Sequence, residues 1–271
     1  GPVEFWKDQG YKGSSDNTNK ILYDFPDPEG KIHITHGPYV EKDVQCNAYM
    51  NYLNKDIDYL FQIDSDEVYK TEDLKKIISF LKKEKPDSVG VKPFSFYGGF
   101  EHYVGGFEQK VDNFLRIFRV RPGSKWITHR PPTMGYALEY THYPRVHVTS
   151  EELFGKLNVG MFHYSYVFPT QVQAKMKYYE SKVARNKIIP DYFWKVWLPW
   201  ATTDLATQKI IEEFGGTRLV EMLYCGVHEF LPEFRGESYT QKFVGKHPEA
   251  IERDMKQLKE RLERELKDYA S

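Results

Sequence analysis

The pattern of hydrophobic and polar positions in the first hundred residues predicts strands and helices in alternation. Residues Lys31–Gly37 alternate between polar and apolar side chains, as a half-buried strand does, and residues 42–53 carry apolar side chains at helical spacing. A compact apolar run over 58–63 predicts another strand, and a helix follows from Thr71 to about Lys85, where Pro86 ends it. This alternation predicts an α/β fold with a mostly parallel central sheet flanked by helices.

The rest of the pattern predicts strands at 113–120 and 158–167, a helix at 170–185 and a second, heavily charged helix near the C-terminus. The charged helix has a narrow apolar stripe at Ile251, Met255, Leu258, Leu262 and Leu266. We therefore expect one domain over residues 1–245 and a helical extension over 246–271. The stripe either lies on its own domain or forms the coiled-coil seam of a homodimer.

Composition narrows the function classes. The 271 residues are 40% hydrophobic, enough for a substantial core, and the net charge of −1 argues against a dedicated nucleic-acid binder. No apolar run approaches the ~20 residues of a transmembrane segment, and Cys46 and Cys225 are too few for a disulfide scaffold. We expect a soluble, cytoplasmic protein. The Gly1-Pro2 pair is typical of a remnant of an expression tag.

An acidic turn, Asp64-Ser65-Asp66-Glu67, directly follows the predicted strand at 58–63. In an extended segment Asp64 and Asp66 project to the same side, and paired carboxylates are suited to Mg²⁺ or Mn²⁺. Val68 and Tyr69 exclude an EF-hand, because they stand where a ligand and a glycine are needed. A solvated, helix-capping turn and a phosphoryl-transfer aspartate are the other interpretations of these residues.

Two motifs in a fixed order carry a resemblance to a known family. The segment SSDNT (Ser14–Thr18) is similar to the S-x-D-x-T turn of family 2 glycosyltransferases, and YLFQIDSDE, about fifty residues later, resembles their D-x-D motif. The helix predicted around KDVQCNA (residues 42–48) stands where that family has one. The resemblance covers about residues 4–170. It implies a GT-A fold and a metal-dependent enzyme that moves a sugar, with inversion, from a nucleotide-diphosphate donor to a glycan or other hydroxyl acceptor.

The resemblance also assigns roles to single residues. It implies that Asp66 holds a Mn²⁺ or Mg²⁺ ion, with Asp64 beside it facing the ribose, and that His163 in the late strand completes the metal site. Without the resemblance, an isolated histidine in an aromatic strand is more often a core residue. Asp16 of the S-x-D-x-T turn would bind the base or ribose. The donor site would also include Lys42, Ser65 and Arg130, whose guanidinium suits diphosphate oxygens.

The catalytic base is the point at which the sequence departs from the family. An inverting enzyme needs a group that deprotonates the acceptor hydroxyl, and related enzymes place an acid after an RIFR-like strand, often directly after a histidine. Here Arg130 follows His129 instead. His129 is our first choice for the base, with Glu101 and His102 as rivals.

Only thirteen residues precede Ser14, so we expect this chain to lack the first strand and first helix of the fold. A non-catalytic sugar- or nucleotide-binding module of a larger assembly is therefore the alternative function. A metal-dependent phosphohydrolase using the same carboxylates is a third.

Overall fold

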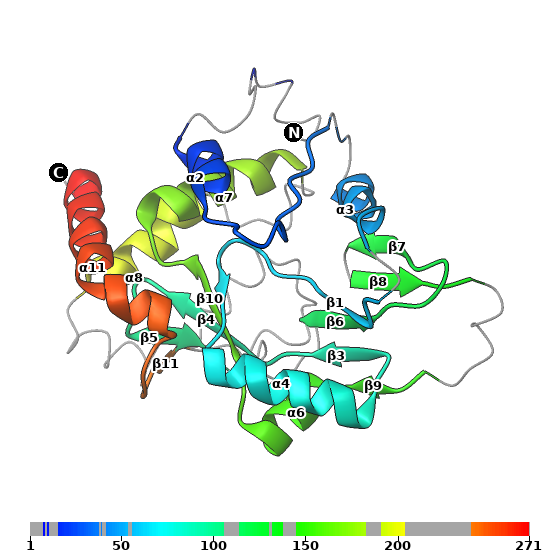
Figure 1. Ribbon diagram of the computed structural model, residues 1–271. Coiled ribbons are helices and arrows are strands. Elements are labelled where there is room, and N and C mark those ends of the chain that lie inside the picture. Colours follow the sequence, from blue (N-terminus) through cyan, green and yellow to red (C-terminus); the bar gives the residue numbers. More distant parts are fainter. Residues whose placement is uncertain are drawn as a thin grey trace. The chain divides into compact units, whose positions relative to one another are not determined.

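The computed structural model divides the chain into two compact units, which are Gly1–Phe61 with Ile117–Val146 and Gln62–Arg116 with His147–Ser271. Figure 1 shows the elements of both units. The residues that the structure describes are 8, 10, 16–37, 39, 42–53, 56–105, 114–129, 132–137, 145–182, 191–203 and 240–270.

The first unit contains helices α2 (Thr18–Asp24) and α3 (Lys42–Met50), and strands β1 (Tyr59–Phe61), β7 (Lys125–His129) and β8 (Pro132–Gly135). It also holds the greater part of β6 (Leu115–Arg119), which runs antiparallel to β1 with Leu60 opposite Phe118. Strands β7 and β8 form an antiparallel hairpin. Helix α3 packs against β7, where the Asn47 side-chain amide accepts from the backbone N–H of Trp126 and donates to its carbonyl.

The strand predicted over Lys31–Gly37 is wrong, because these residues form neither helix nor strand. The Asp27 carboxylate accepts the backbone N–H groups of Lys31 at 2.8 Å and Ile32 at 2.7 Å. Since aspartate side chains readily close turns on their own backbone, two donors that a strand ladder would use are already occupied.

The second unit is built on a five-stranded sheet, whose strands are β2 (Glu67–Val68), β4 (Pro93–Tyr97), β5 (His102–Val104), β10 (Met161–Tyr166) and β11 (Thr240–Lys242). Their order in the sheet is β11-β5-β4-β10-β2. Strand β10 is parallel to β4 and antiparallel to β2, whereas β5 is antiparallel to both β4 and β11. A further pair, β3 (Ser88–Gly90) and β9 (His147–Val148), is parallel.

The α/β class is confirmed, but the sheets are mixed and the expectation of a mostly parallel sheet is wrong. The physical reason is visible between β4 and β5. A parallel partner requires a crossover of a dozen or more residues, usually through a helix. Instead, Gly98 and Gly99 adopt φ values of +67° and +150°, which residues other than glycine rarely adopt. The chain turns back at these glycines, so that β5 pairs directly with β4.

The helices of the second unit include α4 (Thr71–Glu84), which confirms the predicted helix. It buries Ile77, Phe80 and Leu81 and is followed by its C-cap Lys85, a left-handed residue whose N–H donates to the Leu81 carbonyl. Among the described residues, none of the helices combines the length and apolar character that crossing a bilayer requires. The other helical segments are α6 (Ser150–Leu157), α7 (Pro169–Lys182), a π-helix at Phe193–Trp197, α8 (Leu198–Thr202) and α11 (Glu249–Ala270).

Helix α11 packs onto the core of the second unit. Its Leu262 belongs to a buried cluster with Phe96, Phe100, Phe162, Tyr164 and Val167, and the rest of its apolar stripe (Ile251, Met255, Leu258 and Leu266) packs against this cluster. The stripe thus lies on its own domain, one of the two arrangements expected from the sequence. Two acidic side chains of α11 also reach the first turns of other helices. Glu249 accepts from Thr71 at the start of α4, and Glu265 accepts from Thr170 at the start of α7.

Candidate active site

The acidic turn leads into β2, whose first residue is Glu67, and the pairing of β2 with β10 brings His163 beside the turn. The Tyr164 N–H donates to the Asp66 carbonyl at 2.8 Å, and Glu67 stands opposite His163 in the antiparallel register. The imidazole Nε2 of His163 lies 3.5 Å from Oδ2 of Asp66. The structure therefore brings together the two residues that the resemblance assigned to one metal site.

The Asp66 carboxylate is held in its ionised form. Burial raises the pKa of this carboxyl, but the interactions with His163, Lys175 and Ser165 outweigh burial and hold the pKa well below its usual range. The Lys175 ammonium contacts the Ser165 hydroxyl and lies 4.5 Å from the centre of the Tyr166 ring. An aspartate that stays deprotonated at neutral pH has the form that a metal ligand requires.

A buried serine fixes the other side of the His163 ring. The hydroxyl of Ser95, on the neighbouring strand β4, lies 3.1 Å from Nδ1 of His163, and Ser95 is 1% exposed. A cation would take the place of the proton between Nε2 and Asp66, and the serine oxygen could then accept from Nδ1–H. Sequence reasoning missed Ser95, because one serine in an apolar strand carries no signal of its own.

The other two carboxylates of the acidic turn, Asp64 and Glu67, interact with Arg116. The Glu67 side chain is fully buried, and Arg116 Nε donates to its carboxylate, at 3.0 Å from Oε1 and 2.9 Å from Oε2. Arg116 Nη2 also contacts Oε1. The same Nη2 lies 3.8 Å from Oδ2 of Asp64. Asp64 is thus turned to Arg116 while Asp66 is turned to His163. The Glu67–Arg116 pair was not predicted, although Arg116 opens the sequence RIFR at positions 116–119, which resembles the strand that precedes the acid in related enzymes.

Asp66 and His163 fit a divalent cation as two of its ligands. Among the described residues, no group of three or more His, Cys, Asp and Glu side chains is arranged to hold a metal. Mg²⁺ commonly takes only one or two carboxylates from the protein and completes its shell with water and substrate phosphates. Two adjacent ligands on an ion with bonds of ~2.1 Å lie about 3 Å apart, which is close to the observed 3.5 Å.

The residues expected to bind the donor lie in several places. Asp16 is exposed, and its carboxylate accepts the Thr18 N–H at 3.0 Å; this hydrogen bonding with Thr18 lowers the pKa of Asp16. Lys42 is the first residue of α3, and Ser65 is exposed in the acidic turn. Arg130 lies outside the described residues.

His129 ends β7 and is held by a residue that was not predicted. Oδ1 of Asp43 lies 2.7 Å from the backbone N of His129 and 2.5 Å from its imidazole Nδ1. Asp43 stands in the first turn of α3, where an acidic residue is ordinary because it complements the helix dipole. Because this role is common, nothing in the sequence singled out Asp43, although the adjacent Lys42 was predicted as a donor-site residue.

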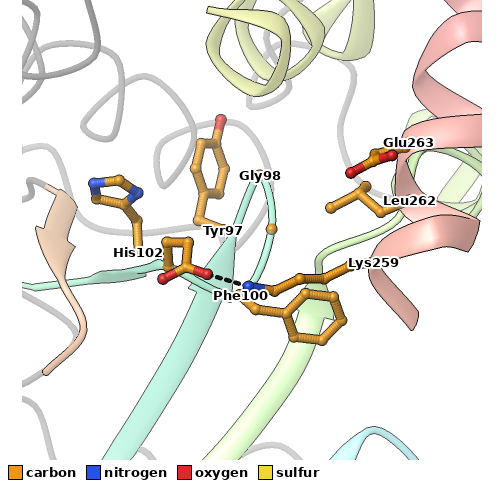
Figure 2. A pocket seen from close by; sticks show the side chains of 9 residues that line it. Tyr97, Gly98, Phe100, His102, Lys259, Leu262 and Glu263 are labelled. Atoms are coloured by element: carbon orange, nitrogen blue, oxygen red, sulfur yellow. Dashed lines mark hydrogen bonds and ion pairs between the residues drawn. The ribbon is translucent and has the colours of Figure 1, made fainter. Parts of the chain in front are cut away.

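Glu101 and His102, the rival bases, line a cavity of about 210 Å³ between the glycine loop 98–99 and α11. Figure 2 shows the residues that line this cavity and the ion pair that reaches Lys259. The Glu101 carboxylate accepts from Lys259 Nζ at 2.5 Å, and this hydrogen bond, the largest influence, lowers the Glu101 pKa. A lowered pKa makes a carboxylate a weaker base. His102 is buried against Trp200, with ring centres 5.9 Å apart.

Comparison with known proteins identifies the segment that carries the S-x-D-x-T turn, the acidic turn and β7. Residues 12–135 match the model of the family described as glycosyl transferase family 2. A search of curated proteins found no match to the chain. The family match confirms the resemblance seen in the two sequence motifs.

Proposed function

We propose that this chain, which over residues 12–135 belongs to glycosyl transferase family 2, is a metal-dependent enzyme that transfers a sugar from a nucleotide diphosphate to a hydroxyl acceptor with inversion. The observation that carries the proposal is the contact between Asp66 and His163. The family match supports glycosyl transfer in general, and this contact supports the metal dependence, because it pairs an ionised carboxylate with an imidazole directly at the D-x-D turn.

The roles of the donor-binding residues follow the resemblance to the family. Asp66 and His163 would hold Mn²⁺ or Mg²⁺, which supplies Lewis-acid stabilisation of the diphosphate leaving group when bound. Asp64 would face the ribose beside the metal, and Asp16 would contact the base or ribose. Lys42, Ser65 and Arg130 would complete the donor contacts.

His129 is the base that we propose for the acceptor. As the acceptor oxygen bonds to the anomeric carbon, the bond from that carbon to the diphosphate oxygen breaks and the hydroxyl proton passes to the imidazole. The Asp43 contact supports this choice, since a base is most effective when a neighbouring group orients it. The ion pair with Lys259 makes Glu101 the weaker candidate.

Donor binding and donor turnover together test the proposal. The full chain is first screened by thermal shift against UDP- and GDP-hexoses with MnCl₂, because a ligand that binds the folded state raises the melting temperature. Release of nucleoside diphosphate is then measured with and without a mixture of hydroxyl acceptors.

Three outcomes of this experiment distinguish three functions. Release that depends on acceptor and Mn²⁺, with inverted anomeric configuration in the product by proton NMR, is the expected result. Binding without release would indicate a sugar- or nucleotide-binding module, and release that ignores the acceptor would indicate a hydrolase. Either of the last two would overturn the transferase.

A further inference from the structure

One carboxylate oxygen of Asp43 makes two contacts with His129. Its Oδ1 accepts the backbone N–H at 2.7 Å and lies 2.5 Å from the imidazole Nδ1. The imidazole side chain is 26% exposed and the carboxylate 37%, so both are partly shielded by the protein and still open to solvent. Both residues belong to the first unit, Asp43 on α3 and His129 at the end of β7.

The chemistry of these atoms determines where the imidazole carries its proton. An ionised carboxylate only accepts hydrogen bonds, so the hydrogen between Asp43 and His129 is on Nδ1. A neutral imidazole that is protonated on Nδ1 has its lone pair on Nε2. The ring is therefore held in one tautomer and one orientation, with Nε2 as the basic atom.

We infer that Asp43 is a positioning residue for His129, which fixes the tautomer whose Nε2 takes the proton from the acceptor hydroxyl. This inference rests on the proposed function, in which His129 is the base. Asp43 itself does not touch the substrate in this role. It selects the productive form of the imidazole before the acceptor arrives and stabilises the imidazolium that forms during transfer.

The main competing explanation is that Asp43 merely docks α3 onto β7. One helical turn later, Asn47 performs that task with backbone groups alone, since its amide donates to the Trp126 carbonyl at 3.0 Å and accepts the Trp126 N–H at 2.9 Å. The Asp43 contact with the His129 backbone N–H is of the same kind. The contact with Nδ1 is different, because docking does not require it.

The tautomer can be read directly by ¹⁵N NMR of histidine-labelled protein above the pH at which the imidazole is charged. We expect the His129 resonances of the unaltered chain to show a protonated Nδ1 and an unprotonated Nε2. In Asp43→Asn, the amide oxygen can still accept the backbone N–H, but the preference for Nδ1–H is reduced. The tautomer distribution shifts toward Nε2–H, and transfer slows by roughly 10²–10⁴-fold, the usual worth of a correctly presented base.

Asn47→Ala is the matched control, because it weakens docking of the same helix on the same strand without touching His129. We expect it to lower stability while the His129 tautomer and the turnover per folded molecule stay unchanged. A His129 ring protonated on Nε2 in the unaltered chain would overturn the inference, and so would a tautomer or turnover that is the same in Asp43→Asn. If the tautomer shifts as expected but the unaltered chain transfers no sugar, Asp43 still fixes the His129 tautomer and it is the proposed function that fails.

Discussion

Nε2 of His163, on β10, and Oδ2 of Asp66, in the turn that leads into the adjacent strand β2, lie 3.5 Å apart although the two residues are far apart in the sequence. If this pair holds the metal, Asp66→Asn should weaken Mn²⁺ binding by at least tenfold, because an amide oxygen lacks the charge that attracts a divalent cation. Isothermal titration with MnCl₂ measures this. Asp64→Asn is the matched control, since the Asp64 carboxylate is turned to Arg116. Equal losses from the two variants would contradict the different roles assigned to them.

Ser95→Ala should weaken Mn²⁺ affinity without removing a ligand. The serine hydroxyl touches only the far nitrogen of the His163 ring, at 3.1 Å, and partners that orient a ligating histidine are commonly worth 10–100-fold in metal affinity. Ser165→Ala offers a comparison on the neighbouring strand, where a serine hydroxyl interacts with Asp66 instead. Unchanged Mn²⁺ affinity in Ser95→Ala would mean that packing alone orients the imidazole.

Arg116→Met should destabilise the fold by about 3–5 kcal/mol, because it leaves the fully buried Glu67 carboxylate without its partner. Urea unfolding followed by circular dichroism measures the change. Lys75→Met is the control, since it removes the cation of an exposed pair with Glu72 on α4 and should have little effect. Similar urea midpoints for the two variants would show that the buried pair contributes no more than a surface one.

Acid should loosen the attachment of α11 through Glu265. Burial raises the pKa of this carboxyl, but hydrogen bonds from Arg261 and Thr170 outweigh it, so the folded-state pKa is lowered. A lowered pKa stabilises the fold above the unfolded value, ~4.3, and this stabilisation is lost as the pH falls through the folded value. The urea midpoint of the unaltered chain should therefore fall more between pH 7 and pH 3 than that of Glu265→Gln.

The control for this titration is Glu260→Gln on the same helix, where the carboxylate is 62% exposed and lies 3.9 Å from Lys256. We expect its pH dependence to match that of the unaltered chain. A Glu265→Gln variant with unchanged pH dependence would show that other groups govern the acid response.

The sequence predicted the helices and strands whose formation depends mainly on their own residues. Helix α4 was predicted from its start at Thr71 and the proline that ends it, and the apolar run around β10 predicted that strand. The motif resemblance paired Asp66 with His163, a juxtaposition that no local pattern contains. The features that were missed depend on side chains that bind backbone N–H groups or that contact residues distant in the sequence. Asp27 occupies the donors of the predicted strand at 31–37, and Ser95 and Asp43 acquire meaning only when β4 meets β10 and α3 meets β7.

The capping of α4 and α7 by α11 has a consequence for how this protein is made. Thr71 and Thr170 lie in the first turns of their helices, yet the carboxylates that they donate to are 178 and 95 positions later in the chain. During synthesis both helices therefore emerge before these two carboxylates, and the Phe96–Phe162 cluster emerges before the helix that packs against it. The contacts of α11 with the second unit can form only after residue 265 has been made, so we expect them to be a late step of folding.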